Sequence, residues 1–450
     1  MSEAPEGTTA GGVASTPIQA AEVQEQNSWM EPSVWTERMR TALEKGVKGG
    51  KWFSLIDKVW KKENLSRSYE RVARNKGCAG VDHVSTEGYG RNLERETERL
   101  HRALQEGRYR PQALRRKEIP KSGGKGKRPL SIPTVRDRVL HTAVRHVIEP
   151  IFERTFAGCS YGFRPGRGCK DALREVVNLL EAGHLHVVDA DLSRCFDTIP
   201  HGPLLKRVEE QVADGRLLEL LGTFLKQGVM ANGVIREADE GTPQGGPLSP
   251  LLANIYLNPL DHLMEGKAYR IIRYADDLVL LCRSQEEAES ALARLSEWVQ
   301  ANGLSLNKEK TRLVDMTQPS AYFDFLGYRF LRTQKSKRIR WTARPQSVKK
   351  LRNRLRSATK RKQGCSMERT IQRINPILRG WYAYFQHAIP GTFSPVDAWV
   401  RMRLRSILRK RHGRRGRGRG ADHQRWPNAY FTELGLFSLS AARATVRSSA

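Results

Sequence analysis

The chain alternates between stretches whose apolar residues recur every three or four positions and shorter apolar runs that end at turns. The first pattern is typical of amphipathic helices and the second of buried strands. The pattern predicts helices at about 53–60, 86–107, 137–152, 203–212, 251–260 and 286–301. It predicts strands at 184–192, at 271–281, directly after 303–311, and at 323–330. Such a mixture predicts an α/β (α+β) fold.

The most informative strand region is 271–281, where two apolar runs flank Tyr274-Ala275-Asp276-Asp277. This pattern predicts a buried β-hairpin whose turn holds the two carboxylates side by side. Because adjacent carboxylates repel each other, the arrangement favours a bound cation. Mg²⁺ prefers oxygen ligands, and two such ions can hold the attacking and leaving oxygens of phosphoryl transfer. Taken alone, the tetrapeptide also fits a solvated Asp-Asp turn.

A second acidic position follows the strand at 184–192. Asp189 and Asp191 are two residues apart, so both side chains face the same side of a strand and could approach one cation. Asp197 fits a turn or a helix N-cap. His184 and His186 are expected to be ordinary strand residues, because no His or Cys lies at ligand spacing from them.

Three glycine-containing loops are candidates for nucleic-acid contact. The loop at 120–133 offers Lys121, Lys127 and Arg128 to phosphates of a template or a triphosphate, although it lacks Walker spacing. The loop at 161–168 interleaves aromatic residues with arginines such as Arg164, which suits a nucleic-acid track. The glycine-proline loop at 241–250 presents Gln244 to a base or sugar. Each loop alone also fits a plain solvated connection.

Composition points to a polyanionic partner. The 450 residues carry 78 Lys and Arg against 48 Asp and Glu, a net charge of +30, which favours nucleic acid. An anionic membrane is the rival, but there is no signal peptide, and the longest uncharged run, 241–260, contains four prolines. The six scattered cysteines lack a C-x-x-C pair, which fits reduced thiols. We therefore expect a cytoplasmic protein, cytosolic or nucleoid-associated, with no membrane partner.

The C-terminal part is strongly basic. Acidic residues become rare from about 331, and basic helices are predicted at about 345–362, 366–385 and 395–411. Residues 401–420 include ten Lys and Arg and no acid, so this segment is expected to meet RNA or DNA phosphates. Candidate RNA-binding residues here are Arg379, Trp381, Arg401, Arg405, Arg409 and Lys410. Some aromatic residues must be core, and Trp381 and Phe385 are the first choices.

Several motifs occur together in one order and resemble those of reverse transcriptases. They are Asp191 to Phe196, the loop at 242–250, Tyr274 to Asp277, Lys310, and Phe325-Leu326-Gly327. The finer pattern resembles the group II intron reverse transcriptase/maturase family. It includes Asn75-Lys76-Gly77, Arg128-Pro129-Leu130, Tyr161-Gly162-Phe163-Arg164, the loop at 243–250, Leu378-Arg379-Gly380-Trp381 and the tail at 430–439. The resemblance covers about 52–439, and nothing after it resembles the family's DNA endonuclease.

The resemblance implies a right-hand polymerase with fingers, an antiparallel palm sheet that carries the catalytic hairpin, and an all-α thumb/maturase domain. The expected divisions are a disordered acidic leader at 1–35, fingers at 36–180, palm at 181–335 and the basic helical domain at 336–450. The leader contains five Glu and no Lys or Arg.

The resemblance also implies site roles. Asp191 and Asp276 would bind two Mg²⁺ ions, or Mn²⁺ in their place, and Asp277 would support the pair as a third catalytic carboxylate. Asp189 is the alternative ligand. Phe196 would lie under the sugar and select dNTPs, with Gln244 in the nucleotide site. Lys310 would lie near the leaving group, and Lys121, Lys127 and Arg128 would contact the triphosphate or the template.

The implied function is RNA-templated DNA synthesis from a primer 3′-hydroxyl, together with binding of the protein's own group II intron RNA for splicing and mobility. Partners would be intron RNA, an RNA template, a DNA primer or target, and dNTPs; a monomer and a dimer both stay open. One alternative is a splicing maturase with little polymerase role. Another is a retron-like, diversity-generating or CRISPR-associated reverse transcriptase, against which the Arg379-Gly380-Trp381 segment argues.

Overall fold

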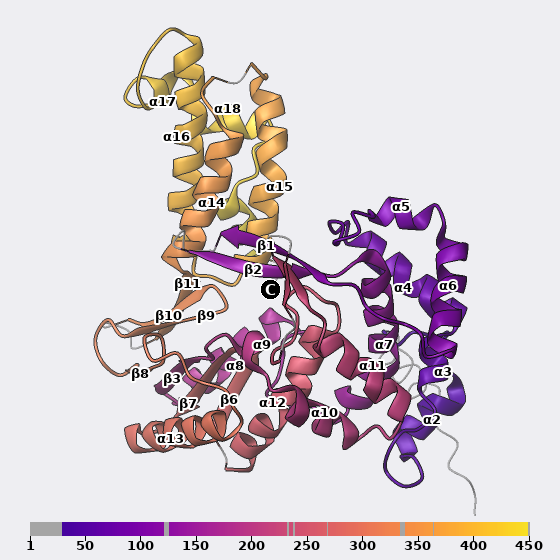
Figure 1. Ribbon diagram of the computed structural model, residues 1–450. Helices are drawn as coiled ribbons and strands as arrows, with labels where there is room; N and C mark the ends of the chain where they lie inside the picture. Colours follow the sequence, from indigo (N-terminus) through magenta and orange to yellow (C-terminus); the bar gives the residue numbers. More distant parts are fainter. Residues whose placement is uncertain are drawn as a thin grey trace, which may run out of the picture.

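The computed structural model describes residues 29–120, 126–231, 234–236, 239–267, 269–333, 338–362 and 364–448. The N-terminal helices form one side of the molecule, drawn in indigo and purple in Figure 1. They are α2 (Glu37–Lys45), α3 (Ile56–Val59), α4 (Lys62–Arg74), α5 (Thr86–Gly90), α6 (Leu93–Gln105) and α7 (Val135–Glu153). Thr134 caps α7 by accepting a hydrogen bond from the Asp137 N–H.

A four-stranded sheet extends from these helices and has the order β2-β1-β4-β5. Strands β1 (Leu114–Pro120) and β2 (Lys127–Ile132) are antiparallel, whereas β1 and β4 (Val229–Ala231) are parallel. Strand β5 (Val234–Arg236) forms the other edge. Strands β4 and β5 lie beyond residue 181, yet they belong to the sheet of the predicted fingers. The expected boundary between fingers and palm at 180 therefore does not separate the two sheets.

The second sheet carries the predicted catalytic hairpin. Its order is β6 (Arg270–Tyr274), β7 (Asp277–Cys282), β3 (His186–Asp191) and β8 (Arg312–Asp315), and all neighbours are antiparallel. Helices packed around it or leading to it are α8 (Cys169–Glu181), α9 (Cys195–Thr198), α10 (His201–Glu209), α11 (Gly215–Leu225), α12 (Ser249–Gly266) and α13 (Gln285–Ala301). The antiparallel palm sheet with its hairpin is as predicted.

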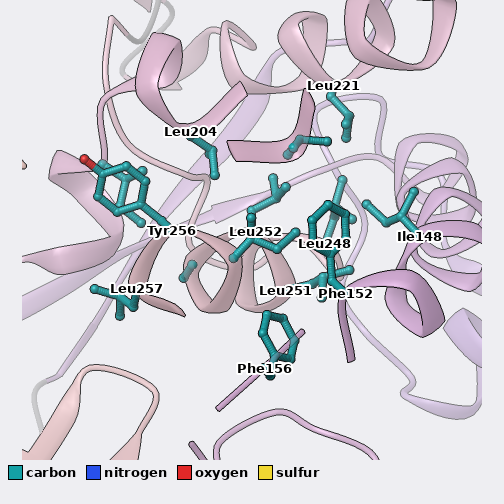
Figure 2. Close-up of a cluster of buried hydrophobic side chains, with 14 of the residues drawn as sticks. Ile148, Phe152, Phe156, Leu204, Leu221, Leu248, Leu251, Leu252, Tyr256 and Leu257 are labelled. Atoms are coloured by element: carbon teal, nitrogen blue, oxygen red, sulfur yellow. The ribbon is translucent and has the colours of Figure 1, made fainter. Parts of the chain in front are cut away.

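Helix α12 lies at the centre of the larger hydrophobic core. Figure 2 shows its leucines and Tyr256 surrounded by side chains of α7, α10 and α11. The buried residues drawn there include Ile148, Phe152, Leu204, Leu221, Leu248, Leu251, Leu252 and Leu257. Burial of each such side chain contributes about 1.5–3 kcal/mol, so this packing fixes α12, and with it the start of the loop that precedes it, against the surrounding helices.

The C-terminal part forms a second core with a third sheet, β11-β10-β9. Its strands are β9 (Tyr322–Phe325), β10 (Tyr328–Arg332) and β11 (Ile339–Ala343). The helices that follow are α14 (Pro345–Ala358), α15 (Met367–Phe385), η1 (Pro390–Thr392), α16 (Ser394–Arg411), α17 (Asp422–Arg425), α18 (Asn428–Glu433) and α19 (Leu439–Ser448). Helices α14 to α16 stand as an upright bundle above the palm in Figure 1.

Three expectations about these elements need correction. The strand expected at 323–330 is a hairpin, because Leu326 and Gly327 adopt positive φ angles of 47° and 83° and reverse the chain. The region from 336 is not all helical, since β11 pairs with β10 across the expected boundary. Of the expected leader, residues 1–28 lie outside the described residues, but Trp35 is fully buried and donates a hydrogen bond to the His146 carbonyl at 2.8 Å.

No helix in the described ranges is both long enough and apolar enough to cross a bilayer.

Candidate active site

The acidic residues meet where the hairpin turns. Tyr274 pairs with Asp277 at the end of β6 and β7, so Ala275 and Asp276 form a two-residue turn, with Ala275 at a φ of +60°. Asp277 begins β7 and lies directly opposite Asp191, the last residue of β3. The fold therefore gathers three carboxylates, separated by up to 86 positions in the sequence, at one end of the palm sheet.

Several carboxylates lie close together at this end of the palm sheet. Burial, followed by the charges of Asp189, Asp276 and Asp191, raises the pKa of Asp277 to about 7, against a weaker opposing hydrogen bond from the Leu326 backbone. Burial is the main cause of this raised pKa and the neighbouring carboxylates add to it, so a cation at this end of the sheet would relieve their repulsion. Burial also raises the pKa of Asp189.

Two basic side chains in or next to β8 form ion pairs with carboxylates at this end of the sheet. Lys310 Nζ lies 2.8 Å from Asp191 Oδ2, and Arg312 Nε lies 3.2 Å from Asp189 Oδ2. Arg312 belongs to β8, directly opposite Asp189 in the register of β3. Asp189 is therefore held by a fixed guanidinium, whereas Asp191 carries an ammonium on a flexible, half-exposed stem.

The residues fit a hard divalent cation in their chemistry. The donors at this end of the sheet are carboxylate oxygens, the ligands that Mg²⁺ prefers, and the Lys310 ammonium stands where positive charge is favourable. Among the described residues, no group of three His, Cys, Asp or Glu is arranged as a ready-made metal site.

A cleft of about 810 Å³ opens over the acidic turn. Its lining includes Tyr274, Ala275, Asp276, Asp277 and Leu326, together with three arginines of the N-terminal helices, Arg71, Arg138 and Arg145. The predicted nucleotide residues Phe196 and Gln244 both line the cleft. The fold thus brings carboxylates, arginines, an aromatic ring and an amide to one cleft.

The glycine-proline loop joins the two sheets at this cleft. Gln244 Nε2 donates to Asp197 Oδ1 at 2.7 Å, and the Gln244 carbonyl accepts the Ser131 N–H at 2.8 Å. Gly245 has a φ of +124°, and a Cβ there would lie 2.7 Å from the Ser131 carbonyl oxygen, so only glycine fits. Asp197, expected to be a turn or capping residue, thus orients the Gln244 amide.

Of the predicted phosphate contacts of the first basic loop, only the Lys127 side chain is among those that the structure describes. Lys127 is exposed, forms an ion pair with Glu118 at 3.1 Å and is not one of the residues that line the cleft. Lys121 lies outside the described residues. Arg128 is in β2, paired through its backbone with Ile119, and its side chain is likewise outside the description.

Two of the predicted RNA-binding residues make structural contacts. Arg164 is buried, forms an ion pair with Glu153 at 2.8 Å and donates to two backbone carbonyls. Arg405 is buried, donates to the Trp426 carbonyl at 2.9 Å and stacks over Phe431. Both guanidinium groups therefore have protein partners in this structure, and RNA contact at these two positions stays a prediction.

The remaining basic candidates are more accessible. Lys410 and Arg379 are exposed, Arg401 is half-buried, and Arg409 donates to Asp422 at 2.7 Å. Trp381 packs on Phe385 with a centroid distance of 4.7 Å, and Phe385 is buried. The aromatic pair thus belongs to the core, as expected, with Trp381 at its edge.

Arg273, which the sequence analysis did not single out, supports the acidic turn. Arg273 is completely buried in β6 and forms a bidentate pair with Asp261 of α12. Its Nη1 also donates to the Ala275 carbonyl at 3.0 Å and to Asn254. The sequence does contain a signal for this role, because an arginine inside an otherwise apolar strand needs a buried partner for its charge.

Comparison with known proteins agrees with this geometry. Residues 119–330 match the reverse transcriptase (RNA-dependent DNA polymerase) family, and residues 348–426 match the group II intron, maturase-specific domain. The fold and the acidic site thus define a reverse transcriptase, an RNA-directed DNA polymerase, that continues into a maturase domain.

The relatives are of the same kind. The chain is 34% identical to protein YkfC of Escherichia coli (strain K12) over 319 residues, which are 62% of this chain and 83% of that protein. It is 38% identical over 196 residues to the group II intron-encoded protein LtrA of Lactococcus lactis subsp. cremoris, covering 43% of this chain but 32% of LtrA. Nuclear intron maturase 2, mitochondrial, of Arabidopsis thaliana is 27% identical over 40% of this chain and 29% of that protein. The chain belongs to the group II intron reverse transcriptase/maturase family.

Among solved structures, a partial Cas6-RT-Cas1–Cas2 complex aligns with a TM-score of 0.36 and 24% identity, over 55% of this chain and 41% of that chain.

Proposed function

We propose that this chain extends a primer 3′-hydroxyl with dNTPs on an RNA template, with Asp191, Asp276 and Asp277 as the catalytic carboxylates. The observation that carries the proposal is the register of β3 and β7, which sets Asp191 against Asp277 beside the cleft that Phe196 and Gln244 line. Two bound Mg²⁺ ions, or Mn²⁺ in their place, would supply Lewis acidity toward the primer hydroxyl and neutralise the triphosphate.

The other roles in the reaction would fall to side chains of the protein. Asp191 and Asp276 would hold the metals, and Asp277, half-buried and held by the Leu326 backbone, would fix their position. Phe196 would underlie the sugar of the incoming nucleotide and exclude a 2′-hydroxyl. Gln244, oriented by Asp197, would contact that nucleotide, and Lys310, released from Asp191, would face the departing pyrophosphate.

The test is primer extension by Asp276→Asn on an RNA template. The neutral amide keeps the shape of the turn but removes the charge, so extension should fall below detection while RNA binding stays intact. Asp315→Asn is the matched control, because Asp315 lies at the opposite end of the same sheet, opposite His186. Undiminished extension by Asp276→Asn would refute the assignment.

We further propose that the basic C-terminal helices bind the group II intron RNA and assist its splicing. The exposed cations Arg379 on α15 and Lys410 on α16 support this, since phosphate contacts dominate RNA affinity. Splicing should therefore survive Asp276→Asn but weaken when these surface charges are removed. Loss of splicing in Asp276→Asn, with folding and RNA affinity unchanged, would contradict two separate sites.

A further inference from the structure

The turn between β9 and β10 reaches the carboxylate cluster. Leu326, in this turn, lines the same cleft as Asp276 and Asp277, and its backbone N–H donates a hydrogen bond to the Asp277 carboxylate. Leu326 has a φ of +47°, a conformation that leucine rarely adopts and that persists where the surrounding structure imposes it. The position of the Asp277 carboxylate therefore depends on what holds this turn.

Helices of the C-terminal part hold the same turn. The Tyr384 hydroxyl of α15 donates to the Leu326 carbonyl at 2.7 Å. At α14, the Ser347 hydroxyl donates to the Gly327 carbonyl at 3.1 Å, and the Arg344 N–H donates to the same oxygen at 3.0 Å. Leu326 belongs to the reverse transcriptase domain and Tyr384 to the maturase domain, so the hydrogen bond between them joins the two domains next to the active site.

Tyr384 also contacts the catalytic hairpin through a thiol. Its hydroxyl and that of Tyr274 are both hydrogen-bonded to Cys169 at the start of α8. Because Tyr384 donates its own proton to Leu326, it accepts the thiol proton, and the Tyr274 hydroxyl donates to the sulfur. Tyr274 directly precedes the turn that contains Asp276. The Tyr384 hydroxyl therefore lies between two segments that lead to catalytic carboxylates.

We propose that the Tyr384 hydroxyl is a positioning group for nucleotide transfer, which fixes the turn at Leu326 and, through this turn, the Asp277 carboxylate. The inference rests on the proposed polymerase function, in which Asp277 is a catalytic carboxylate. Tyr384 is not one of the residues that line the cleft, so it acts through Leu326 and not on the substrate. Polymerase activity then depends on a side chain of the maturase domain.

The experiment compares Tyr384→Phe with wild type in steady-state primer extension on an RNA template and in Mn²⁺ binding. Phenylalanine keeps the ring and removes only the hydroxyl. Tyr382→Phe is the matched control, because Tyr382 lies on the same helix and its buried hydroxyl has no hydrogen-bond partner within the described ranges. Electron paramagnetic resonance of free Mn²⁺ gives the affinity of each protein without nucleic acid. Urea titration shows that each protein is folded under the assay conditions.

Tyr384→Phe should lower kcat, and the affinity for Mn²⁺, by about 3- to 10-fold, somewhat less than the loss of a group that orients a metal ligand directly, because Tyr384 acts through one further peptide. The KM values for dNTP and for primer–template should stay unchanged. Tyr382→Phe should match wild type in every quantity.

Cys169→Ala separates the two contacts of the Tyr384 hydroxyl. It removes the link to Tyr274 and leaves the hydrogen bond to Leu326 in place. Since the proposed effect runs through Leu326, this variant should keep the kcat and the Mn²⁺ affinity of wild type.

Four results would overturn the proposal. If Tyr384→Phe raises the KM for primer–template at unchanged kcat, the turn holds the primer and not Asp277. If kcat falls while Mn²⁺ affinity does not, the hydroxyl positions something other than the metal-binding carboxylates. If Cys169→Ala reproduces the loss, the effect runs through Tyr274. If Tyr384→Phe changes only stability, the hydroxyl is purely structural.

The polymerase assignment fails in a different way. In that case wild type itself extends no primer, or Asp276→Asn extends it as well as wild type does. Neither outcome depends on Tyr384, so the two failures are distinguishable.

Discussion

The ammonium of Lys310 lies 2.8 Å from Oδ2 of Asp191, the carboxylate that the fold sets opposite Asp277. The pair is accessible, with side chains 62% and 36% exposed, so its energetic contribution is small, about 0.2–1 kcal/mol. A cation that approaches Asp191 must nevertheless compete with this ammonium. The lysine therefore occupies, in the protein alone, a carboxylate that the proposed chemistry assigns to Mg²⁺.

Replacing Lys310 with Met should strengthen binding of Mn²⁺ to the protein free of nucleic acid. Removal of the competing charge predicts about 1.5- to 5-fold tighter binding, which electron paramagnetic resonance of free Mn²⁺ can measure. Lys308→Met, an equally exposed lysine of the same turn, is the control and should leave the affinity unchanged. Weaker binding in Lys310→Met would mean that this ammonium supports the metal site rather than competes for it.

Arg273 should be essential for stability although it touches no substrate. Arg273→Met would leave Asp261 buried and unpaired and should lower the free energy of unfolding by about 3–5 kcal/mol. Urea titration measures the loss, and Arg270→Met, at the exposed start of the same strand, should change stability by less than about 0.5 kcal/mol. The double variant Arg273→Met/Asp261→Leu should recover part of the loss. Equal effects of Arg273→Met and Arg270→Met would contradict the buried-charge argument.

Phe196 should set the choice of sugar. Phe196→Val shortens the side chain at the cleft, so space for a 2′-hydroxyl opens. The ratio of kcat/KM for dNTP to kcat/KM for rNTP should therefore fall at least about tenfold, which corresponds to a lost steric contact of about 1.4 kcal/mol or more. Phe196→Tyr keeps the ring and should stay selective. Steady-state incorporation of matched dNTP and rNTP on one RNA template gives both ratios, and an unchanged ratio in Phe196→Val would exclude this residue as the selector.

The acidic hairpin could be predicted because its signal is local. Apolar runs on both sides of Tyr274-Ala275-Asp276-Asp277 define both strands and the turn, and Asp191 ends a strand of equally clear pattern. What distinguishes Asp191 from Asp189 is the pairing of β3 with β7, more than eighty residues away: Asp191 lies opposite Asp277, whereas Asp189 lies opposite Val279. Such long-range pairing leaves no trace in the spacing of either segment.

Composition is likewise a poor guide to the surroundings of single residues. Arg164 and Arg405 belong to basic stretches that indicate RNA binding, yet tertiary packing buries both against carbonyl oxygens. Likewise, composition predicts disorder up to residue 35, but Trp35 reaches the His146 carbonyl through a contact that composition cannot report. Composition describes a segment as a whole. Whether a given side chain in that segment is exposed or buried depends on tertiary packing, and this differs from one residue to the next.

His141 should make the protein sensitive to acid. Burial lowers the pKa of His141 from its ordinary 6.5 to about 3, so below pH 6.5 the unfolded state binds a proton that the folded state does not. Its contribution to stability is complete above pH 6.5 and is lost as the pH falls toward 3. Between pH 6.5 and 4.5 the free energy of unfolding should drop by up to about 2.7 kcal/mol from this residue alone. His141→Leu should lack that drop and the exposed His423→Leu should keep it; parallel stability curves for His141→Leu and wild type would contradict the assignment.

The C-terminal arginines and lysines should separate into two groups when RNA binding and stability are measured together. Lys410→Gln removes an exposed charge from α16, so it should weaken RNA binding, lower the slope of log affinity against log salt by about 0.7–0.9, and leave the unfolding temperature unchanged. Arg405→Gln, at a position five residues earlier in the same helix, removes the buried donor to Trp426 and Asn428 and should cost about 1–3 kcal/mol of stability with no change in the salt slope of the folded protein. Filter binding at four salt concentrations and urea unfolding of the same preparations distinguish the two outcomes. A reduced salt slope in folded Arg405→Gln would show that this guanidinium reaches RNA after all, and an unchanged slope in Lys410→Gln would move the RNA-binding surface away from the end of α16.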